Sequence, residues 1–398
     1  MMTWVMRTAL VVMLLGPARP AAAGDYRTQG ACGGFPRVGL QASPGLCVGL
    51  VAEHLGAARG VAVLGDAIYV LDMGGWQTGR GRLLRLGHDG HDAPEVLLSG
   101  LDEPNGLTVT PDGSLYAGLL GRVVRVVLSG PVPVLKDVLT GLPTAGSHPL
   151  SSVAAAPDGS LYVNVGSATD HCEGPGGTPP DPGVACPERA ATPPRASLVR
   201  VVPGPGGIAW PKAEAVAFGL RNSMGLAVMP GGALVATVNA RDAIGDADPA
   251  LSDELLPHDT LDVIAQGADY GWPYCFDDNR ASPEYAHHDC SAMHRPSLLL
   301  PPHGAPLGLL RYRGDVLPGL KGRLVIAFHG YRAQGHRLMG LAVGADGRPS
   351  GAPSPLVWGW DRTERNPQGA PVGLAEMGDG SVLVTEDQNG TLLRLARP

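Results

Sequence analysis

His148 is the first residue whose type and position suit chemistry. It follows a loop that begins at Thr144 and comes just before an apolar segment, 151–155, that predicts a buried strand. A neutral imidazole in such a loop can accept a proton from a substrate hydroxyl near pH 7. The sequence leaves a second interpretation open, in which His148 only bonds the neighbouring backbone.

Arg221 and Asn222 form the second candidate group. They stand in GLRNSMGLAV, immediately before another apolar strand pattern. An arginine there can hold a carboxylate or a quinone oxygen through paired N–H donors, and the amide adds a further donor and acceptor. The alternative is a salt bridge between two structural units.

The third candidate is the segment 239–248, NARDAIGDAD. Carbonyl and carboxylate oxygens at this density suit Ca²⁺, although the spacing is not that of an EF-hand. A solvated acidic loop is the competing interpretation. His303, and the group His329, Tyr331 and Arg332 in AFHGYR, also lie at strand edges, where each could instead be structural.

Several common catalytic motifs are missing from the sequence. It contains no nucleophile elbow, phosphate-binding loop or H-E-x-x-H helix. The glycine-rich stretch 74–82 lacks the G-x-G-x-x-G spacing and opens no helix, which argues against a Rossmann dinucleotide site.

A phrase that returns along the chain indicates what positions these residues. Residues 104–116 read PNGLTVTPDGSLY and residues 149–162 read PLSSVAAAPDGSLY. Weaker copies stand at 59–69, 223–235, 306–325 and 371–384. Each copy predicts a strand, a tight turn and a second strand, and six such units are typical of an all-β, six-bladed β-propeller.

The expected blades follow from these copies. We expect them at 59–86, 104–127, from His148, from Gly219, at 304–343 and at 372–396. The segment 48–52 reads as a strand, and in propellers a terminal strand often completes the last blade, so the two chain ends should be neighbours. We expect 169–195 to be an excursion from the third blade and 269–302 to connect the fourth to the fifth.

Composition narrows the class of protein. The 58 Gly and 38 Pro suit many tight turns and argue against long helices. The net charge of −7 and the absence of a basic run argue against a nucleic-acid partner. The N-terminus has the layout of a secretory signal peptide, 1–23, so we expect a propeller domain over 24–398 in a secreted or periplasmic protein without a membrane span.

The six cysteines agree with export. They fall into three close pairs, and local disulfides are the simplest interpretation in an oxidising compartment: Cys32–Cys47, Cys172–Cys186 and Cys275–Cys290. Six cysteines allow 15 connectivities, which the sequence does not distinguish. A zinc site needs tighter spacing, such as C-x₂-C.

Taken together, these segments resemble the soluble glucose/sorbosone dehydrogenase family, in particular its sorbosone-dehydrogenase-like subgroup. The resemblance covers most of 104–395, in order, and rests on PDGSLYVNVGS, FGLRNSMGLAV, VNARDAIGD, DYGWPY, HGAPLGL, AFHG and PVGLAEMGDGSVLVTEDQNGTLLRL. It implies a secreted six-bladed propeller that uses pyrroloquinoline quinone (PQQ) and Ca²⁺.

The resemblance also implies roles. His148 would be the general base that takes the proton of the sugar C1 hydroxyl, and Arg221 would stabilise charge on the reacting oxygen. Cofactor contacts would come from Arg221, Asn222, His303, Tyr331 and Arg332. The backbone carbonyls of Arg241 and Asp242 would bind Ca²⁺, which polarises the quinone.

The chain departs from the family pattern at named places. Met224 stands where the glucose dehydrogenases have a cofactor-contacting Gln, and HGYRAQ replaces an HGSWNR-like phrase. Ala370 stands where an Arg often precedes the final PVG. Arg362 and Arg365 are the nearby candidates to supply that charge.

The resulting expectation is an oxidoreductase that oxidises an aldose or a related sugar aldehyde by His-assisted hydride transfer to PQQ. Electrons would pass to an external acceptor, because the chain has no C-x-x-C-H haem motif. Two alternatives remain open: a Ca²⁺-dependent propeller hydrolase such as a lactonase, and a propeller that binds a glycan or a protein without catalysis.

Overall fold

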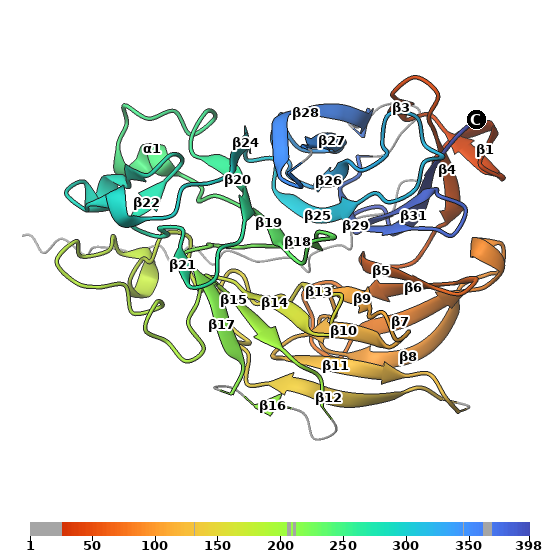
Figure 1. Cartoon of the computed structure of the whole chain (residues 1–398), viewed down its shortest axis with the longest axis horizontal. Coiled ribbons are helices and arrows are strands. Elements are labelled where there is room, and N and C mark those ends of the chain that lie inside the picture. Colours follow the sequence, from red (N-terminus) through yellow and green to blue (C-terminus); the bar gives the residue numbers. More distant parts are fainter. Residues whose placement is uncertain (1–25, 131, 205–207, 210–211, 345, 361–367) are drawn as a thin grey trace, which may run out of the picture.

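A computed structural model describes residues 26–130, 132–204, 208–209, 212–344, 346–360 and 368–398. Within these residues the chain forms six antiparallel sheets that surround a central axis as the blades of a β-propeller (Figure 1). The fold expected from the repeats is therefore confirmed. The expected signal segment, 1–23, lies outside the described residues, and none of the described helices is long and apolar enough to cross a membrane.

Each blade consists of four strands, the first of which lies nearest the axis. The first blade comprises β5 (Ala58–Leu64), β6 (Ala67–Asp72), β7 (Gly81–Leu86) and β8 (Glu95–Leu101). The second comprises β9 (Leu107–Val109), β10 (Leu115–Leu119), β11 (Arg122–Val127) and β12 (Val134–Thr140), with β16 (Ile208–Ala209) added in parallel. The third comprises β13 (Val153–Ala155), β14 (Leu161–Val165), β15 (Ser197–Val201) and β17 (Glu214–Phe218), with β21 (Ala268–Asp269) added in parallel.

The remaining blades follow the same order. The fourth comprises β18 (Gly225–Val228), β19 (Leu234–Val238), β20 (His258–Val263) and β24 (Leu298–Pro302). The fifth comprises β25 (Pro306–Arg311), β26 (Leu324–Phe328), β27 (Arg337–Val343) and β28 (Pro349–Trp358), with β3 (Gln41–Ala42) at its edge. The sixth comprises β29 (Pro371–Glu376), β30 (Val382–Glu386), β31 (Thr391–Ala396) and β4 (Cys47–Ala52), followed by β2 (Phe35–Val38) and β1 (Thr28–Cys32).

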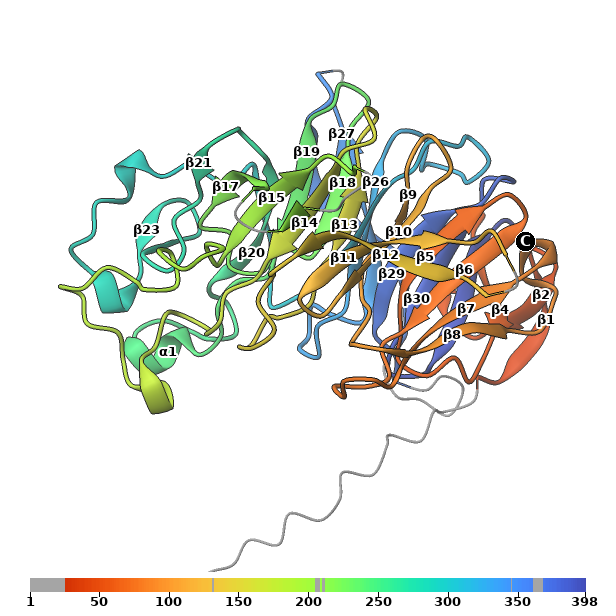
Figure 2. The ribbon, with the colours of Figure 1, turned by 90° about the horizontal axis from the view of Figure 1, so that it is seen from below.

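Short elements lie in the long loops. They are the hairpin β22 (Cys275–Phe276) and β23 (Arg280–Ala281), the helix α1 (Ile244–Ala247), and the 3₁₀ turns His88–Gly90, Pro175–Gly177, Pro283–Tyr285 and Cys290–Ala292. Seen from below, the loops that carry α1 and β23 extend well beyond the blades (Figure 2).

The outer strands differ from the sequence-based expectation. The expected blades ended after three strands, and 269–302 was expected to connect two blades, whereas β24 is the fourth strand of the fourth blade. These strands lie on the outside of each blade and are partly exposed, so their apolar pattern is weak. In β28 two prolines interrupt the pattern further, as is tolerated at a sheet edge.

The ring is closed as expected by strands from the two ends of the chain. β4 pairs with β31, with Leu50 opposite Leu393, so the sixth blade contains both early and late residues. The Tyr26 hydroxyl donates to the buried Glu386 carboxylate at 2.9 and 3.0 Å, which ties the first described residue to the same blade.

Glycines explain why the repeated phrase contains G-L or G-V. A methyl group at the glycine of one inner strand would overlap backbone or Cβ atoms at the next inner strand around the ring. The residues concerned are Gly60, Gly106, Gly308 and Gly373, while at Gly225 a methyl group would overlap the Thr237 hydroxyl of its own blade and touch Leu309 Cβ of the next at 3.0 Å. The inner strands therefore touch at one level, and in the third blade Ser152 takes the equivalent place.

The core lies between neighbouring blades, where their apolar faces pack. One cluster joins the fifth and sixth blades around the buried Trp360 and Tyr312, and another joins the second and third blades. All three expected disulfides are present, Cys32–Cys47, Cys172–Cys186 and Cys275–Cys290. The last two lie in the loops that extend beyond the blades (Figure 2).

Candidate active site

The segments that precede the inner strands meet in one cavity of about 380 Å³ at the end of the axis where those strands begin. This volume lies within the range of roughly 300–1,000 Å³ that is usual for small-molecule sites. Residues singled out in the sequence line it together: His148, Arg221, Asn222, Asp242, His303, Tyr331 and Arg332. Arg241 is the exception, because it is buried and does not line the cavity.

Hydrogen bonds around His148 determine which ring nitrogen is basic. Its Nδ1 lies 2.9 Å from the Ser167 hydroxyl and 3.2 Å from the Ser167 carbonyl oxygen. The Ser167 hydroxyl donates its own hydrogen to the Thr169 carbonyl at 2.7 Å, so it can only accept from His148. Nδ1 therefore carries the hydrogen, and Nε2, which has no partner among the described residues, keeps its lone pair.

The surroundings keep His148 neutral. Burial, reinforced by the nearby Arg221 cation, lowers the pKa of His148 to about 3. The imidazole is therefore uncharged over the physiological range and can accept a proton at Nε2.

Arg221 is fixed by the disulfide-bonded loop of the third blade. Its guanidinium forms a salt bridge with the Asp170 carboxylate, and its Nε donates to the Asp170 carbonyl at 3.0 Å. Burial disfavours the Asp170 charge, but hydrogen bonding from His171 and the Arg221 cation hold the pKa of that carboxyl well below its usual range. The salt bridge that the sequence left open thus exists, and Arg221 lines the cavity as well.

Asn222 has an unused acceptor. Its side chain lines the cavity, and its Oδ1 is buried without a hydrogen-bond partner among the described residues. Leaving such an atom unpaired costs free energy unless a ligand or a water molecule donates a hydrogen bond to it. This oxygen is therefore open to a donor from a bound molecule.

The backbone carbonyl groups of Arg241 and Asp242 differ in their hydrogen bonding. The Asp242 carbonyl accepts from the Nε of Arg241 at 3.2 Å, whereas the Arg241 carbonyl accepts no hydrogen bond from a described residue. The Arg241 guanidinium points instead to Glu284, at 2.7 Å from both carboxylate oxygens. Among the described residues no group of three or more His, Cys, Asp or Glu could hold a metal, so a cation here would depend on carbonyls and on ligand oxygens.

Two further side chains meet at the Asp242 carboxylate. His303 Nδ1 lies 3.4 Å and Arg332 Nη2 3.2 Å from its Oδ1. The hydrogen bond from His303 lowers the pKa of Asp242, and although burial opposes it, the same contact leaves the pKa of His303 raised. Tyr331 stands at the rim with 61% of its surface exposed.

Sequence reasoning missed a second charged group in this cavity. Arg59 Nη1 binds the Asp387 carboxylate at 2.6 Å, and His329 Nε2 lies 3.1 Å from both oxygens of the same carboxylate. Arg59 stands directly before the first glycine of the repeated phrase, which is the one signal that could have identified it. The proposed substitutes Arg362 and Arg365 lie outside the described residues.

Residues 205–338 match the model of the Glucose / Sorbosone dehydrogenase family. The chain resembles the glucose/sorbosone dehydrogenases. This confirms the resemblance inferred from the sequence, without distinguishing the sorbosone subgroup. A curated relative, an uncharacterized protein of Borreliella burgdorferi, is 29% identical over 195 residues, which are 46% of this chain and about half (49%) of that protein.

Solved structures similar to this glucose/sorbosone dehydrogenase-like chain show the same fold. A Trichoderma reesei carbohydrate-active enzyme of family AA12 has a TM-score of 0.73 at 20% identity, over 93% of this chain and 100% of that one. The PQQ domain of Coprinopsis cinerea pyranose dehydrogenase has 0.71 at 19%, over 92% and 99%. The PQQ-bound aldose sugar dehydrogenase of Streptomyces coelicolor has 0.59 at 18%, over 89% and 99%.

Proposed function

We propose that this protein is a PQQ- and Ca²⁺-dependent dehydrogenase of an aldose or a related sugar aldehyde, of the sorbosone or glucose type. The observation that carries the proposal is the pairing of a neutral His148, whose Nε2 is free, with the fixed Arg221 cation in one cavity. The family match and the PQQ-containing structures of similar fold support it.

The lining of the cavity fits a flat polycarboxylate. Three guanidinium groups, from Arg59, Arg221 and Arg332, line it. Arginine binds carboxylates through paired donors, and the unpaired Asn222 Oδ1 adds an acceptor. Arg221, Asn222, His303, Tyr331 and Arg332 would hold the cofactor, with Arg59 as an additional cation.

The Ca²⁺ ion would lie against the Arg241 and Asp242 carbonyls. The Arg241 carbonyl is free of hydrogen bonds from described residues, and the Asp242 carbonyl shares one with Arg241 Nε. The Asp242 carboxylate lies on the same residue and could add a ligand oxygen. When bound, PQQ supplies the carbonyl carbon that accepts hydride, and Ca²⁺ polarises it as a Lewis acid.

The residues of the chain would act on the sugar as follows. Oxidation removes one proton and one hydride from the C1 hydroxyl and C1 carbon of an aldose, which leaves a lactone. His148 Nε2 accepts the proton, because Nδ1 is already protonated and bonded to Ser167. Arg221 lies beside the reacting oxygen and stabilises negative charge as the proton leaves.

The rest of the assignment concerns partners and location. Electrons would pass to an external acceptor, and the substrate is a small sugar. Three disulfides agree with an extracellular or periplasmic protein, and we propose that 1–23 is its signal peptide and 24–398 the propeller domain.

The test is a titration of purified, metal-stripped protein with PQQ and Ca²⁺, read by quinone absorbance, followed by a panel of aldoses. We expect saturable binding and bleaching by a sugar. His148→Ala should keep PQQ binding and lose bleaching, whereas His88→Ala, at an exposed histidine remote from the cavity, should change neither.

Two results would refute this function. The first is no binding at micromolar PQQ. The second is metal-dependent lactone hydrolysis without any quinone spectrum, which would favour the hydrolase alternative.

A further inference from the structure

Two aromatic side chains are exposed at the mouth of the candidate active site. Of the Trp, Tyr and Phe side chains in the described residues, Trp76 and Tyr331 alone are largely exposed, at 63% and 61%. Both line the same cavity. Exposed aromatic groups that gather at one cavity indicate contact with a ligand.

The two aromatic residues come from different blades. Trp76 lies in the loop between β6 and β7 of the first blade, and Tyr331 lies in the loop between β26 and β27 of the fifth. The second strand of each blade runs antiparallel to the inner strand, so these loops return to the end of the axis where the site lies.

Hydrogen bonds hold the loop on both sides of Trp76. The buried Asp72 carboxylate accepts from the Gly74 backbone N–H at 2.8 Å, and the Asp102 carboxylate accepts from the Gly79 backbone N–H at 2.9 Å. The indole itself has no hydrogen bond, ring contact or cation–π contact with a described residue. An ordered loop therefore presents an indole that is free to stack on a ligand, at a low cost in conformational entropy.

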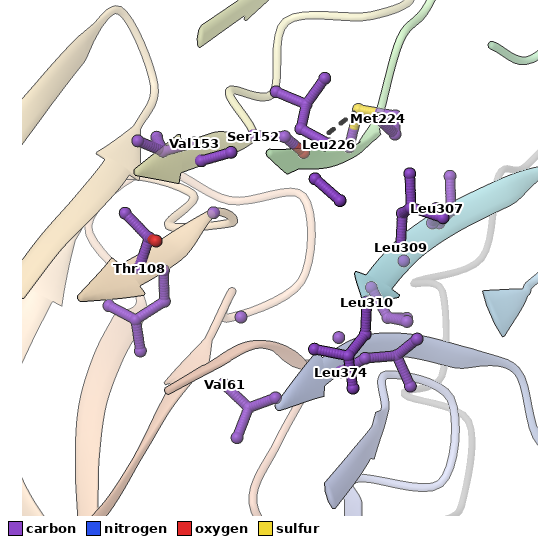
Figure 3. A pocket seen from close by; sticks show the side chains of 18 of the residues that line it. Val61, Thr108, Ser152, Val153, Met224, Leu226, Leu307, Leu309, Leu310 and Leu374 are labelled. Carbon is purple, nitrogen blue, oxygen red and sulfur yellow. Dashed lines mark hydrogen bonds between the residues drawn. The ribbon is translucent and has the colours of Figure 1, made fainter. Parts of the chain in front are cut away.

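The inner side of the cavity is closed by a buried apolar cluster. Met224, Leu150 and Met73 pack together, with Leu307 against them. The Met224 Sδ accepts from the Ser152 hydroxyl at 3.9 Å (Figure 3). Met224 and Leu307 line both this cavity and the next one along the axis, so they lie between the two. A sugar longer than the cavity therefore has to extend outward, past the rim.

The reacting end of such a sugar would be its innermost part. Proton removal at C1 needs His148 Nε2 and Arg221, and Arg221 is only 6% exposed. The groups attached at the opposite end of the reducing unit would then point toward the exposed Trp76.

An indole at the rim suits the face of a sugar ring. A pyranose carries C–H groups on its face and hydroxyl groups around its edge, so an aromatic ring can cover the face while water still solvates the hydroxyls. The interior of the cavity is different, because three guanidinium groups line it and suit an anion.

We propose that Trp76 forms an outer subsite for the second unit of a short reducing oligosaccharide, whose reducing-end unit lies beside His148. Tyr331 borders this subsite from the opposite loop. The inference rests on the function proposed above and narrows its substrate class. Since Tyr331 is also assigned to the cofactor, the test uses Trp76.

The first test measures sugar binding without catalysis. Maltose, cellobiose and lactose are titrated calorimetrically into the protein before PQQ is added. We expect at least one of them to bind, and Trp76→Ala to bind it at least tenfold more weakly. Gln77→Ala, at an exposed neighbour that does not line the cavity, should bind like the wild type. A thermal melt of each variant establishes that it is folded.

The second test uses the PQQ-loaded protein. The ratio of kcat/KM for the bound disaccharide to kcat/KM for glucose should exceed one in the wild type. It should fall about tenfold in Trp76→Ala, less in Trp76→Phe, and stay unchanged in Gln77→Ala.

The inference is overturned if no disaccharide binds below about 10 mM, or if Trp76→Ala and Gln77→Ala bind and discriminate alike. It is also overturned if Trp76→Ala raises KM for the electron acceptor instead of the disaccharide. Failure of the proposed function is distinct, because it would appear as normal disaccharide binding with no change in quinone absorbance.

Discussion

The hydroxyl hydrogen of Ser167 determines which ring nitrogen of His148 is protonated. Since Ser167 donates to the Thr169 carbonyl, it must accept from His148 Nδ1, and the opposite nitrogen, Nε2, keeps its lone pair. Burial and Arg221 then keep that base uncharged. Neither effect comes from a nearby carboxylate, and the Arg221 cation disfavours a positive charge on the imidazole, so the basicity of His148 is modest.

Substitution of His148 and of Ser167 should separate the roles of these two residues. We expect His148→Ala to lower kcat by about 10²–10⁴-fold, the usual contribution of a general base. Ser167→Ala should lower it far less, by about tenfold, because the Ser167 carbonyl at 3.2 Å still fixes the tautomer. Steady-state kinetics with the PQQ-loaded variants measures both values, and equal losses would contradict this division of roles.

The pH profile of the reaction is a separate prediction. A base with a pKa of about 3 stays deprotonated as the pH rises from 5 to 8, so His148 should impose no acidic limb on kcat/KM in this range. Its neutral form would be lost only as the pH falls through about 3. A limb near pH 6 that disappears in a His148 variant would show that the imidazole is more exposed than described.

Much of the candidate site could be predicted from the sequence, and the reason is its position in the repeat. His148, Arg221 and Asn222 each precede an inner strand by a few residues, and a propeller brings all such positions to one end of its axis. The group of Arg59, Asp387 and His329 could not be predicted, because its members come from three blades and their charges reveal no pairing until the ring is closed.

At the scale of elements, two disulfide-bonded loops support the site jointly. Trp272, in the loop of Cys275, donates through Nε1 to the Asp170 carbonyl at 2.9 Å, and that residue holds Arg221. Glu284, between Cys275 and Cys290, holds Arg241. The sequence predicted the disulfide in each loop. It did not predict the contact between the two loops, because that contact depends on tertiary packing.

Removal of different disulfides should therefore have different consequences. We expect Cys172→Ser/Cys186→Ser to weaken PQQ affinity by tenfold or more, with a small change in Tm, because it loosens Asp170. Cys32→Ser/Cys47→Ser, in the closing strands, should lower stability by about 2–5 kcal/mol and leave PQQ affinity unchanged. Absorbance titration and thermal melts compare the two, and the reverse pattern would contradict the assignment.

Glu386, at the end of β30, predicts a pH dependence of stability. Burial raises its pKa from an ordinary value of 4.5 to about 7, despite hydrogen bonds from Thr391 and Tyr26. The folded state therefore holds the proton more tightly than the unfolded state. This contribution is fully present below pH 4.5 and is lost as the pH rises through 7, by about 3 kcal/mol in total.

Glu386→Gln removes this titration. The unfolding free energy of the variant minus that of the wild type should rise by about 3 kcal/mol between pH 4.5 and pH 8. Urea denaturation at both pH values measures it, and the other buried acid with a pKa raised to about 7, Asp262, cancels in the difference. A difference that does not change with pH would contradict the prediction.

At the scale of the whole molecule, the glycines at the inner strands set how closely neighbouring blades can approach one another. A methyl group at Gly308 would overlap the Val372 carbonyl oxygen of the next blade, whereas one at Gly231 would meet no atom within 4 Å. We expect Gly308→Ala to lower stability by about 1–3 kcal/mol and Gly231→Ala to change it little. Thermal melts compare the two, and equal shifts would show that the ring widens freely.

The overall ring was predictable for the same reason, because the repeated glycine is visible in the sequence. The outer strands were not, since they have one exposed side and contribute few apolar residues to the pattern. β12, for example, reads VLKDVLT, with its charged residues exposed.

The pairing of β4 with β31 also constrains when the sixth blade can form during synthesis of the chain. The sixth blade needs a strand from residues 47–52 and one from residues 391–396, so its sheet cannot be completed until residues 391–396 have been synthesised. Until then the edge of β4 that faces away from β2 has no partner strand and is open to incorrect pairing. A chain that lacks residues 391–396 would therefore hold five complete blades and an open ring.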